Sequence, residues 1–304
     1  MSSQLKNIAI IGGSGNIGQI ILKGLLSASA FNITALTRTS SIATFPAGVT
    51  VRRSDFSNAD LQATFKGQDA VISVVGATGF AEQKKLIDAA IAAGVSRFLP
   101  SEFSADTLNE TVLNLLPLFW QKKEVLDYLK KKESKSFSWT GVASSGLFDW
   151  GIANGFFQFD IASRTATIWD DGNKNFTLTN EKQLGDAVVS VLKNPEITAN
   201  RYLYISSVET SQNEILAALE KATSCKWTLH HTTTEQQVTE GSKKLQAGDF
   251  EGALQLVRAI PYGTTPGLDS NYAKDRMLAN DLLGLKEESV QETIQRVVDE
   301  TKTN

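Results

Sequence analysis

Residues 7–26 read NIAIIGGSGNIGQIILKGLL, and this stretch decides the fold class. The apolar run 7–11 is typical of a buried strand, and the isoleucines and leucines behind it recur at helical spacing. The glycine-rich segment between them satisfies G-x-x-G-x-x-G in the strand–helix context of a dinucleotide-binding loop, where backbone N–H groups attract a pyrophosphate. We therefore predict that a dinucleotide is bound by Gly12, Gly13, Ser14, Gly15, Asn16, Ile17 and Gly18. The alternative is a glycine-rich turn without a ligand.

Strand-like and helix-like segments alternate through the first half of the chain. Apolar runs such as 31–36 and 70–75 are separated by segments with helical periodicity, among them 82–93. This alternation predicts an α/β fold with a doubly wound parallel sheet, the Rossmann arrangement. Beyond residue 150 the rhythm weakens, although residues 200–206 read as a strand that returns to the main sheet. The tail 273–301 has a helical pattern, interrupted at a glycine.

The end of the second expected strand selects the cofactor. In NAD-specific sites an Asp or Glu at this place holds the ribose 2′-hydroxyl. This chain instead has Arg38, Thr39 and Ser40, which can bind a 2′-phosphate, so we predict NADP(H). The alternative for Arg38 is a solvated surface arginine. The loop after the fourth strand is expected either to border the cofactor or simply to end the strand, and it contains Val75, Gly76 and Ala77.

Composition excludes several classes of protein. The 304 residues carry a net charge of −3 with a pI near 5.6, so we expect no surface for nucleic acid or an anionic membrane. No apolar run is long enough to span a bilayer, and we expect no signal peptide. Cys225 is the only cysteine, which excludes an intrachain disulfide and suits a cytoplasmic protein. His230 and His231 are the only histidines, so we expect no metal site.

A lysine interrupts the apolar stripe of a predicted helix over residues 116–129, LPLFWQKKEVLDYL. At about 100° per residue, Lys122 lies on the same side as Val125 and Leu129, whereas Lys123 lies off that stripe. Burial would lower the pKa of Lys122 towards neutrality, where a general acid or base works, so we predict a catalytic role. The alternative is a lysine whose stem packs while its charged end reaches water.

A second arrangement on the same helix offers a rival catalytic pair. Tyr128 and Lys132 match the Tyr-x-x-x-Lys pattern of short-chain dehydrogenases. Tyr128 lies about 9 Å further along the helix axis than Lys122 and off the apolar stripe. We therefore interpret this pair as part of an exposed, basic helix end.

Six motifs together resemble the NmrA-like, isoflavone-reductase-like family of atypical short-chain dehydrogenases, in particular its fungal members. The resemblance covers essentially the whole chain. The motifs are IIGGSGNIGQ (10–19), TRTSS (37–41), AAGVSRFLPSEF (92–103), QKKEVLDYL (121–129), GLFDWG (146–151) and PGLDSNYAKDRMLANDLLGL (266–285).

The resemblance implies that different parts of the chain bind the cofactor and the substrate. It implies an NADP-binding Rossmann domain over residues 1–150 and a smaller, interleaved α/β substrate domain over 151–304. In the family's reductases a lysine at the position of Lys122 is the acid/base residue, and the resemblance implies that it can also hold the ribose hydroxyls. The motif PSEF would place Phe103 near the nicotinamide; the alternative is a helix-capping turn at Ser101. We expect Phe148, Trp150 and Phe156 either to line a pocket for an aromatic substrate or to belong to the hydrophobic core.

These observations favour an NADPH-dependent reductase of a small aromatic, phenolic or enone metabolite. The main alternative is a non-catalytic NADP-binding regulator or redox sensor, because the family includes such proteins. A third possibility, an epimerase or dehydratase with tightly held NAD, is opposed by Arg38. The expected partner is a small-molecule substrate, and the sequence leaves a monomer and a homodimer equally open.

Overall fold

The computed structural model describes residues 5–303, and its main sheet has seven strands in the order β11-β6-β5-β4-β1-β2-β3. Neighbouring strands from β3 to β6 pair in parallel. The strand order reverses between β1 and β4, which is the point where doubly wound sheets bind their ligands. The predicted fold class is confirmed. The strands are β1 Asn7–Ile11, β2 Asn32–Arg38, β3 Val49–Ser54, β4 Ala70–Ser73, β5 Arg97–Leu99, β6 Ser138–Ala143 and β11 Arg201–Tyr204.

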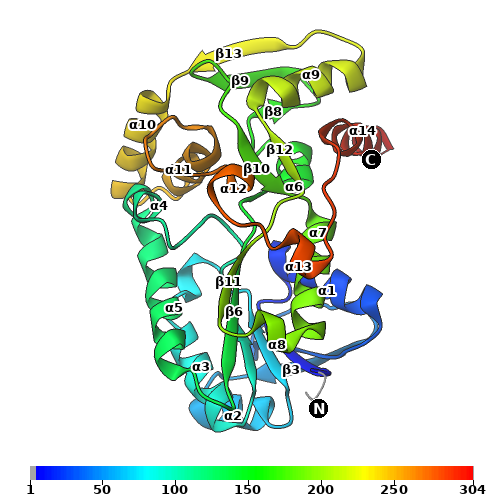
Figure 1. The fold of residues 1–304 in the computed structure, drawn as a ribbon, viewed down its shortest axis with the longest axis vertical. Coiled ribbons are helices and arrows are strands. Elements are labelled where there is room, and N and C mark those ends of the chain that lie inside the picture. The colour runs from blue at the N-terminus through cyan, green and yellow to red at the C-terminus, as the bar shows by residue number, and fades with distance from the viewer. Residues whose placement is uncertain (1–4, 304) are drawn as a thin grey trace. The chain divides into compact units, whose positions relative to one another are not determined.

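Helices cover both faces of this sheet (Figure 1). Helices α2, α3 and α5 pack against one another in series, and α1 crosses α7. The α1–α7 crossing is close because a Cβ at Gly24 would lie 2.8 Å from the Cα of Gly185. The helices that belong with this sheet are α1 Asn16–Ala28, α2 Asn58–Phe65, α3 Gln83–Ala92, α5 Trp120–Lys132, α7 Glu181–Lys193 and α8 Pro195–Thr198.

The chain forms two compact units that interleave in sequence. The first contains the described residues up to Phe103, with Leu118–Ala143 and Lys182–Leu203; the second contains the remainder. The expected boundary at residue 150 therefore differs from the structure. The connection after β5 is long enough to contribute Ser104–Pro117 to the second unit, whereas α7 and most of β11 return to the first. The cofactor and substrate roles expected for the two parts stay predictions.

The second unit has two small sheets, ordered β12-β10-β7 and β13-β9-β8. Its core contains many aromatic side chains, including those of Phe148, Phe157 and Tyr262. Its strands are β7 Gly146–Leu147, β8 Phe159–Asp160, β9 Thr165–Trp169, β10 Phe176–Thr179, β12 Val208–Thr210 and β13 Thr228–Thr232. Its helices are α4 Glu110–Leu115, α6 Phe148–Ala153, α9 Gln212–Thr223, α10 Thr234–Gln246, α11 Glu251–Tyr262, α12 Tyr272–Asp275, α13 Asn280–Leu283 and α14 Val290–Thr303.

The C-terminal tail differs from the expected pair of helices. It forms three separate helices, α12, α13 and α14. Gly284 ends α13 with a positive φ of 67°, as expected for a helix stop, but α12 is only four residues long. Within residues 5–303, none of the helices combines the length and the apolar character needed to cross a membrane.

Candidate functional site

The glycine-rich turn joins β1 to α1 and leaves the start of the helix uncapped by any side chain. Gly12 has a positive φ of 82°, and a Cβ there would lie 2.4 Å from the carbonyl oxygen of Val74. A Cβ at Gly18 would lie 2.3 Å from the oxygen of Gly12. At Gly15 the nearest atom would be 3.4 Å away, so packing within the protein does not require glycine there. The missing side chain at Gly15 instead leaves backbone accessible beside exposed Ser14 and Asn16, which fits the approach of a pyrophosphate.

Arg38 ends β2 on the same edge of the sheet and is exposed. Among residues 5–303 no group forms a hydrogen bond or ion pair with its guanidinium. The turn after it is fixed: Ser41 N donates to the oxygen of Arg38 at 3.0 Å, and both the N–H and the hydroxyl of Thr39 donate to the oxygen of Ser54 at 3.0 Å. Arg38 and the exposed Ser40 are therefore available to a phosphate, whereas the hydroxyl proton of Thr39 is already engaged.

The loops after β4 and β5 are tied together at the carboxyl edge of the sheet. The hydroxyl of Ser101 donates to the oxygen of Val75 at 2.8 Å, and its N–H donates to Gln83. Ser101 caps no helix, because the next helix, α4, is capped by Asn109. Gly76 is exposed and a Cβ there would meet nothing within 4 Å, so the protein itself leaves room at this place.

Lys122 lies in the first turn of α5 and is only 4% exposed. Its Nζ donates to the backbone oxygen of Glu102 at 2.9 Å and lies 4.8 Å from the ring centres of Phe80 and Phe119. The ammonium group is thus held by residues that follow β4 and β5, and it does not snorkel to water. Burial lowers the pKa of Lys122 to about 8, and the negative charge of Glu102 partly opposes that shift.

Glu102 has a second partner, at its carboxylate, that the sequence did not reveal. Glu102 is 2% exposed, and the hydroxyl of Tyr202 in β11 donates to its Oε2 at 3.1 Å. Gly141 in β6 makes room for this pair, since a Cβ there would lie 2.8 Å from the Tyr202 ring. Glu102 and Tyr202 are 100 residues apart in sequence, so no local pattern could have joined them.

The rival pair on α5 points elsewhere. The hydroxyl of Tyr128 donates to both carboxylate oxygens of Asp88 on α3, at 2.7 and 2.8 Å, and Lys132 forms an ion pair with Asp88 at 2.9 Å. Lys123 forms its own ion pair with Asp127 at 2.6 Å. These groups form a partly exposed surface network, and their distance along the helix keeps them away from the sheet edge that holds Lys122.

The three aromatic residues expected to line a substrate pocket have different environments in the second unit. Phe148 is 0% exposed and belongs to the core, so it presents no surface to a ligand. Trp150 and Phe156 are half-buried, with ring centres 5.6 Å apart, and the Arg258 guanidinium lies 5.3 Å from the Phe156 ring centre. We correct the expectation for Phe148, which packs inwards from α6, and keep Trp150 and Phe156 as predictions.

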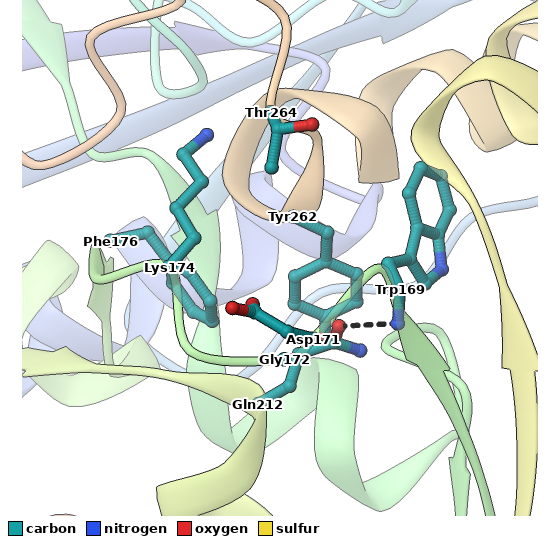
Figure 2. A pocket seen from close by; sticks show the side chains of 8 residues that line it. All are labelled: Trp169, Asp171, Gly172, Lys174, Phe176, Gln212, Tyr262 and Thr264. Atoms are coloured by element: carbon teal, nitrogen blue, oxygen red, sulfur yellow. Dashed lines mark hydrogen bonds between the residues drawn. The ribbon is translucent and has the colours of Figure 1, made fainter.

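A small pocket of the second unit is lined by strand, loop and helix residues that the sequence did not single out (Figure 2). It has essentially no room for even a water-sized molecule, so it is well below the size usual for ligand sites. Its polar groups have internal partners: Gln212 accepts from the N–H of Trp169 at 2.9 Å, and Lys174 donates to the oxygens of Ile260 and Gly263 at 3.3 and 2.5 Å. Burial lowers the pKa of Lys174 to about 8. We interpret this pocket as structural.

Among residues 5–303, no group of three or more His, Cys, Asp or Glu side chains is arranged to hold a metal ion.

Comparisons with known proteins place the chain among reductases. Oxidoreductase aprR of Aspergillus flavus is 36% identical over 294 residues, which cover 96% of this chain and 98% of that protein. Phenylcoumaran benzylic ether reductase Betv6 of Betula pendula is 32% identical over 238 residues, covering 70% and 73%. The structure of leucoanthocyanidin reductase from Vitis vinifera in its binary complex with NADPH has the same fold, with a TM-score of 0.78 at 17% identity over 96% of this chain and 99% of that one. The model of the NmrA-like family matches residues 4–256, and with that match the chain belongs to the NmrA-like family.

Proposed function

We propose that this chain is an NADPH-dependent reductase of a small aromatic, phenolic or enone compound, with Lys122 as its acid/base residue. The observation that carries the proposal is the buried ammonium group of Lys122, held 2.9 Å from the oxygen of Glu102 at the carboxyl edge of the sheet. The names of the two relatives, an oxidoreductase and a benzylic ether reductase, support reduction as the class of reaction.

The residues present suit NADP(H) as the cofactor. The open backbone around Gly15 would receive the pyrophosphate, and Arg38 with Ser40 would bind the 2′-phosphate. The residues from Val75 to Ala77, together with Phe103, would border the ribose and nicotinamide. The bound cofactor supplies a hydride to a carbon atom of the substrate. The NADPH named in the Vitis vinifera complex supports this choice of cofactor.

Lys122 would hold and move the proton that the reduction requires. With a pKa of about 8, the ammonium form prevails at neutral pH, and it gives up a proton more readily than an exposed lysine does. The residue would donate this proton to a carbonyl, ether or phenolic oxygen and stabilise negative charge there. The same group could also hold ribose hydroxyls, which would place it beside the reacting carbon.

The test is whether the purified protein oxidises NADPH with a panel of aromatic carbonyl, enone and benzylic ether compounds. We expect turnover with at least one of them, and we expect Lys122→Met to reduce it by about 10²–10⁴-fold while NADPH still binds. Lys123→Met is the matched control, because Lys123 pairs with Asp127 on the helix surface and should leave turnover within about twofold. If NADPH binds but no compound is reduced above the Lys122→Met background, the chain is a dinucleotide-binding regulator and the proposal is wrong.

A further inference from the structure

A tight turn follows β2 and is anchored to the neighbouring strand β3. The N–H of Ser41 donates to the oxygen of Arg38 at 3.0 Å, which is the bond of a β-turn over residues 38–41. Both donors of Thr39 bond to the oxygen of Ser54 at the end of β3. The segment in which we place the 2′-phosphate is therefore positioned by β3 as well as by β2.

Arg53 of β3 reaches the same turn. The register pairs Thr37 with Arg53 and Arg38 with Ser54, so the two arginines start from adjacent positions on neighbouring strands. Nη1 of Arg53 donates to the backbone oxygen of Ser41, which places its guanidinium against the last residue of the turn. A guanidinium has five N–H donors, and a single carbonyl leaves most of them for another acceptor.

The charges around Arg53 leave its positive charge uncompensated. The side chain is exposed and forms no ion pair with a carboxylate among residues 5–303. The next acidic residue along the chain, Asp55, lies beyond the end of β3 and accepts the N–H of Ser57 at 2.8 Å. The turn of four residues thus begins at Arg38, contains Ser40 and is contacted at Ser41 by Arg53, a set of groups that suits a phosphate dianion.

We propose that Arg53 is a second cation for the cofactor 2′-phosphate and, with Arg38, sets the preference for NADPH over NADH. This inference rests on the proposed NADP(H) function and adds a residue to it. Two guanidinium groups that approach one another are stabilised by the dianion between them, whereas a ribose 2′-hydroxyl offers no such compensation. Arg53 would therefore contribute to discrimination between the two cofactors rather than to binding of dinucleotides in general.

The chain contains a matched control at the adjacent position. Arg52 has the same chemistry and is also exposed on β3, but the contact with the turn comes from Arg53. Arg52 is paired with Leu36 in the register, one position further from the turn. Removing its charge should change the net charge of the protein equally without touching the 38–41 turn.

The experiment compares dissociation constants for NADPH and NADH by calorimetry in the wild type, Arg53→Gln, Arg52→Gln and Arg38→Gln. We expect Arg53→Gln to weaken NADPH binding by about 5–30-fold, to change NADH binding by less than about twofold, and to reduce the salt dependence of NADPH binding. Arg53→Lys, which keeps the charge, should restore part of the loss. Arg52→Gln should behave like the wild type.

Two results would overturn the inference. Equal losses for both cofactors would mean that Arg53 only holds the turn, and an unchanged NADPH affinity would mean that it lies outside the phosphate site. If Arg38→Gln weakens NADPH binding and Arg53→Gln does not, this inference fails while the proposed cofactor stands. If the wild type does not prefer NADPH and Arg38→Gln has no effect, the proposed cofactor fails and this inference fails with it.

Discussion

The buried charge of Lys122 should leave a measurable trace in the pH dependence of stability. Burial lowers the pKa of this residue from 10.5 to about 8 in the folded protein. At about 1.4 kcal/mol for each pH unit, the charged form is disfavoured by about 3 kcal/mol relative to the unfolded chain. The residue is 4% exposed, so screening by solvent reduces this figure little. Lys122→Met removes the charge and keeps most of the volume of the side chain.

The sign of the effect follows from proton binding. Below pH 8 the lysine carries a proton in both the folded and the unfolded state. Between pH 8 and pH 10.5 the unfolded chain still binds that proton while the folded protein has released it. The free energy of unfolding contributed by Lys122 therefore rises with pH across this window, and it is lost as the pH falls through 8. Lys122→Met has no such contribution.

The assay is urea unfolding of the wild type and Lys122→Met at several pH values from 7 to 10.5. The free energy of unfolding of the wild type minus that of the variant should increase by about 3 kcal/mol over the range, and the titration of all other groups cancels in the difference. Lys123→Met, which alters a partly exposed ion pair, should give a nearly flat difference. A flat difference for Lys122→Met would refute the depressed pKa. In the same window kcat/KM for reduction should decline above about pH 8, as the proton donor is lost.

Four further predictions concern the cofactor site and the rival pair. Arg38→Ala should weaken NADPH binding by about 10–100-fold and leave NADH binding nearly unchanged, as measured by calorimetry; equal changes would argue against the 2′-phosphate contact. Gly15→Ala should keep the melting temperature but weaken NADPH binding by about tenfold or more, because the new methyl group has room in the protein only where the pyrophosphate should approach. Gly18→Ala should instead lower the free energy of unfolding by about 1–3 kcal/mol, since its Cβ meets the oxygen of Gly12 at 2.3 Å; an unchanged stability would mean that the turn yields easily. Tyr128→Phe should leave turnover within about twofold, and a large loss would restore the Tyr-x-x-x-Lys interpretation.

Local patterns predicted the elements that organise the sheet. The apolar run before Gly12 forms β1, as predicted, and the glycine segment forms the turn after it. The isoleucines behind the turn lie on the buried face of α1. The stripe on α5 was also correct, with Val125 and Leu129 fully buried around Lys122. These features repeat with the period of a helix or a strand, so a short window of sequence contains the information.

Contacts between distant segments could not be predicted in this way. The bond of Tyr202 to Glu102 depends on β11 lying next to β6, and the contact of Arg53 with Ser41 depends on the register of β2 and β3. A shift of one residue would turn Arg53 to the other face of the sheet. Helix α10 was not predicted for a different reason: it buries little, since Thr234 and Gly241 are its only buried residues, and its apolar pattern is correspondingly weak.

A depressed pKa does not by itself identify a functional lysine, and the two buried lysines of this chain illustrate why. Lys174 also has a pKa lowered to about 8, but it donates to the carbonyl oxygens of Ile260 and Gly263 at the end of α11, where a cation stabilises unpaired carbonyl groups. These contacts with carbonyl groups are enough to explain why a charged side chain is buried at this position. Lys122 lies near the start of α5, where the helix dipole disfavours a cation; its ammonium group donates to the backbone oxygen of Glu102 and lies beside two aromatic rings. A methionine would fill that space without the cost of a buried charge, so the lysine requires a reason outside packing. Its position beside the loops after β4 and β5, at the edge where a parallel sheet binds its ligands, supplies one.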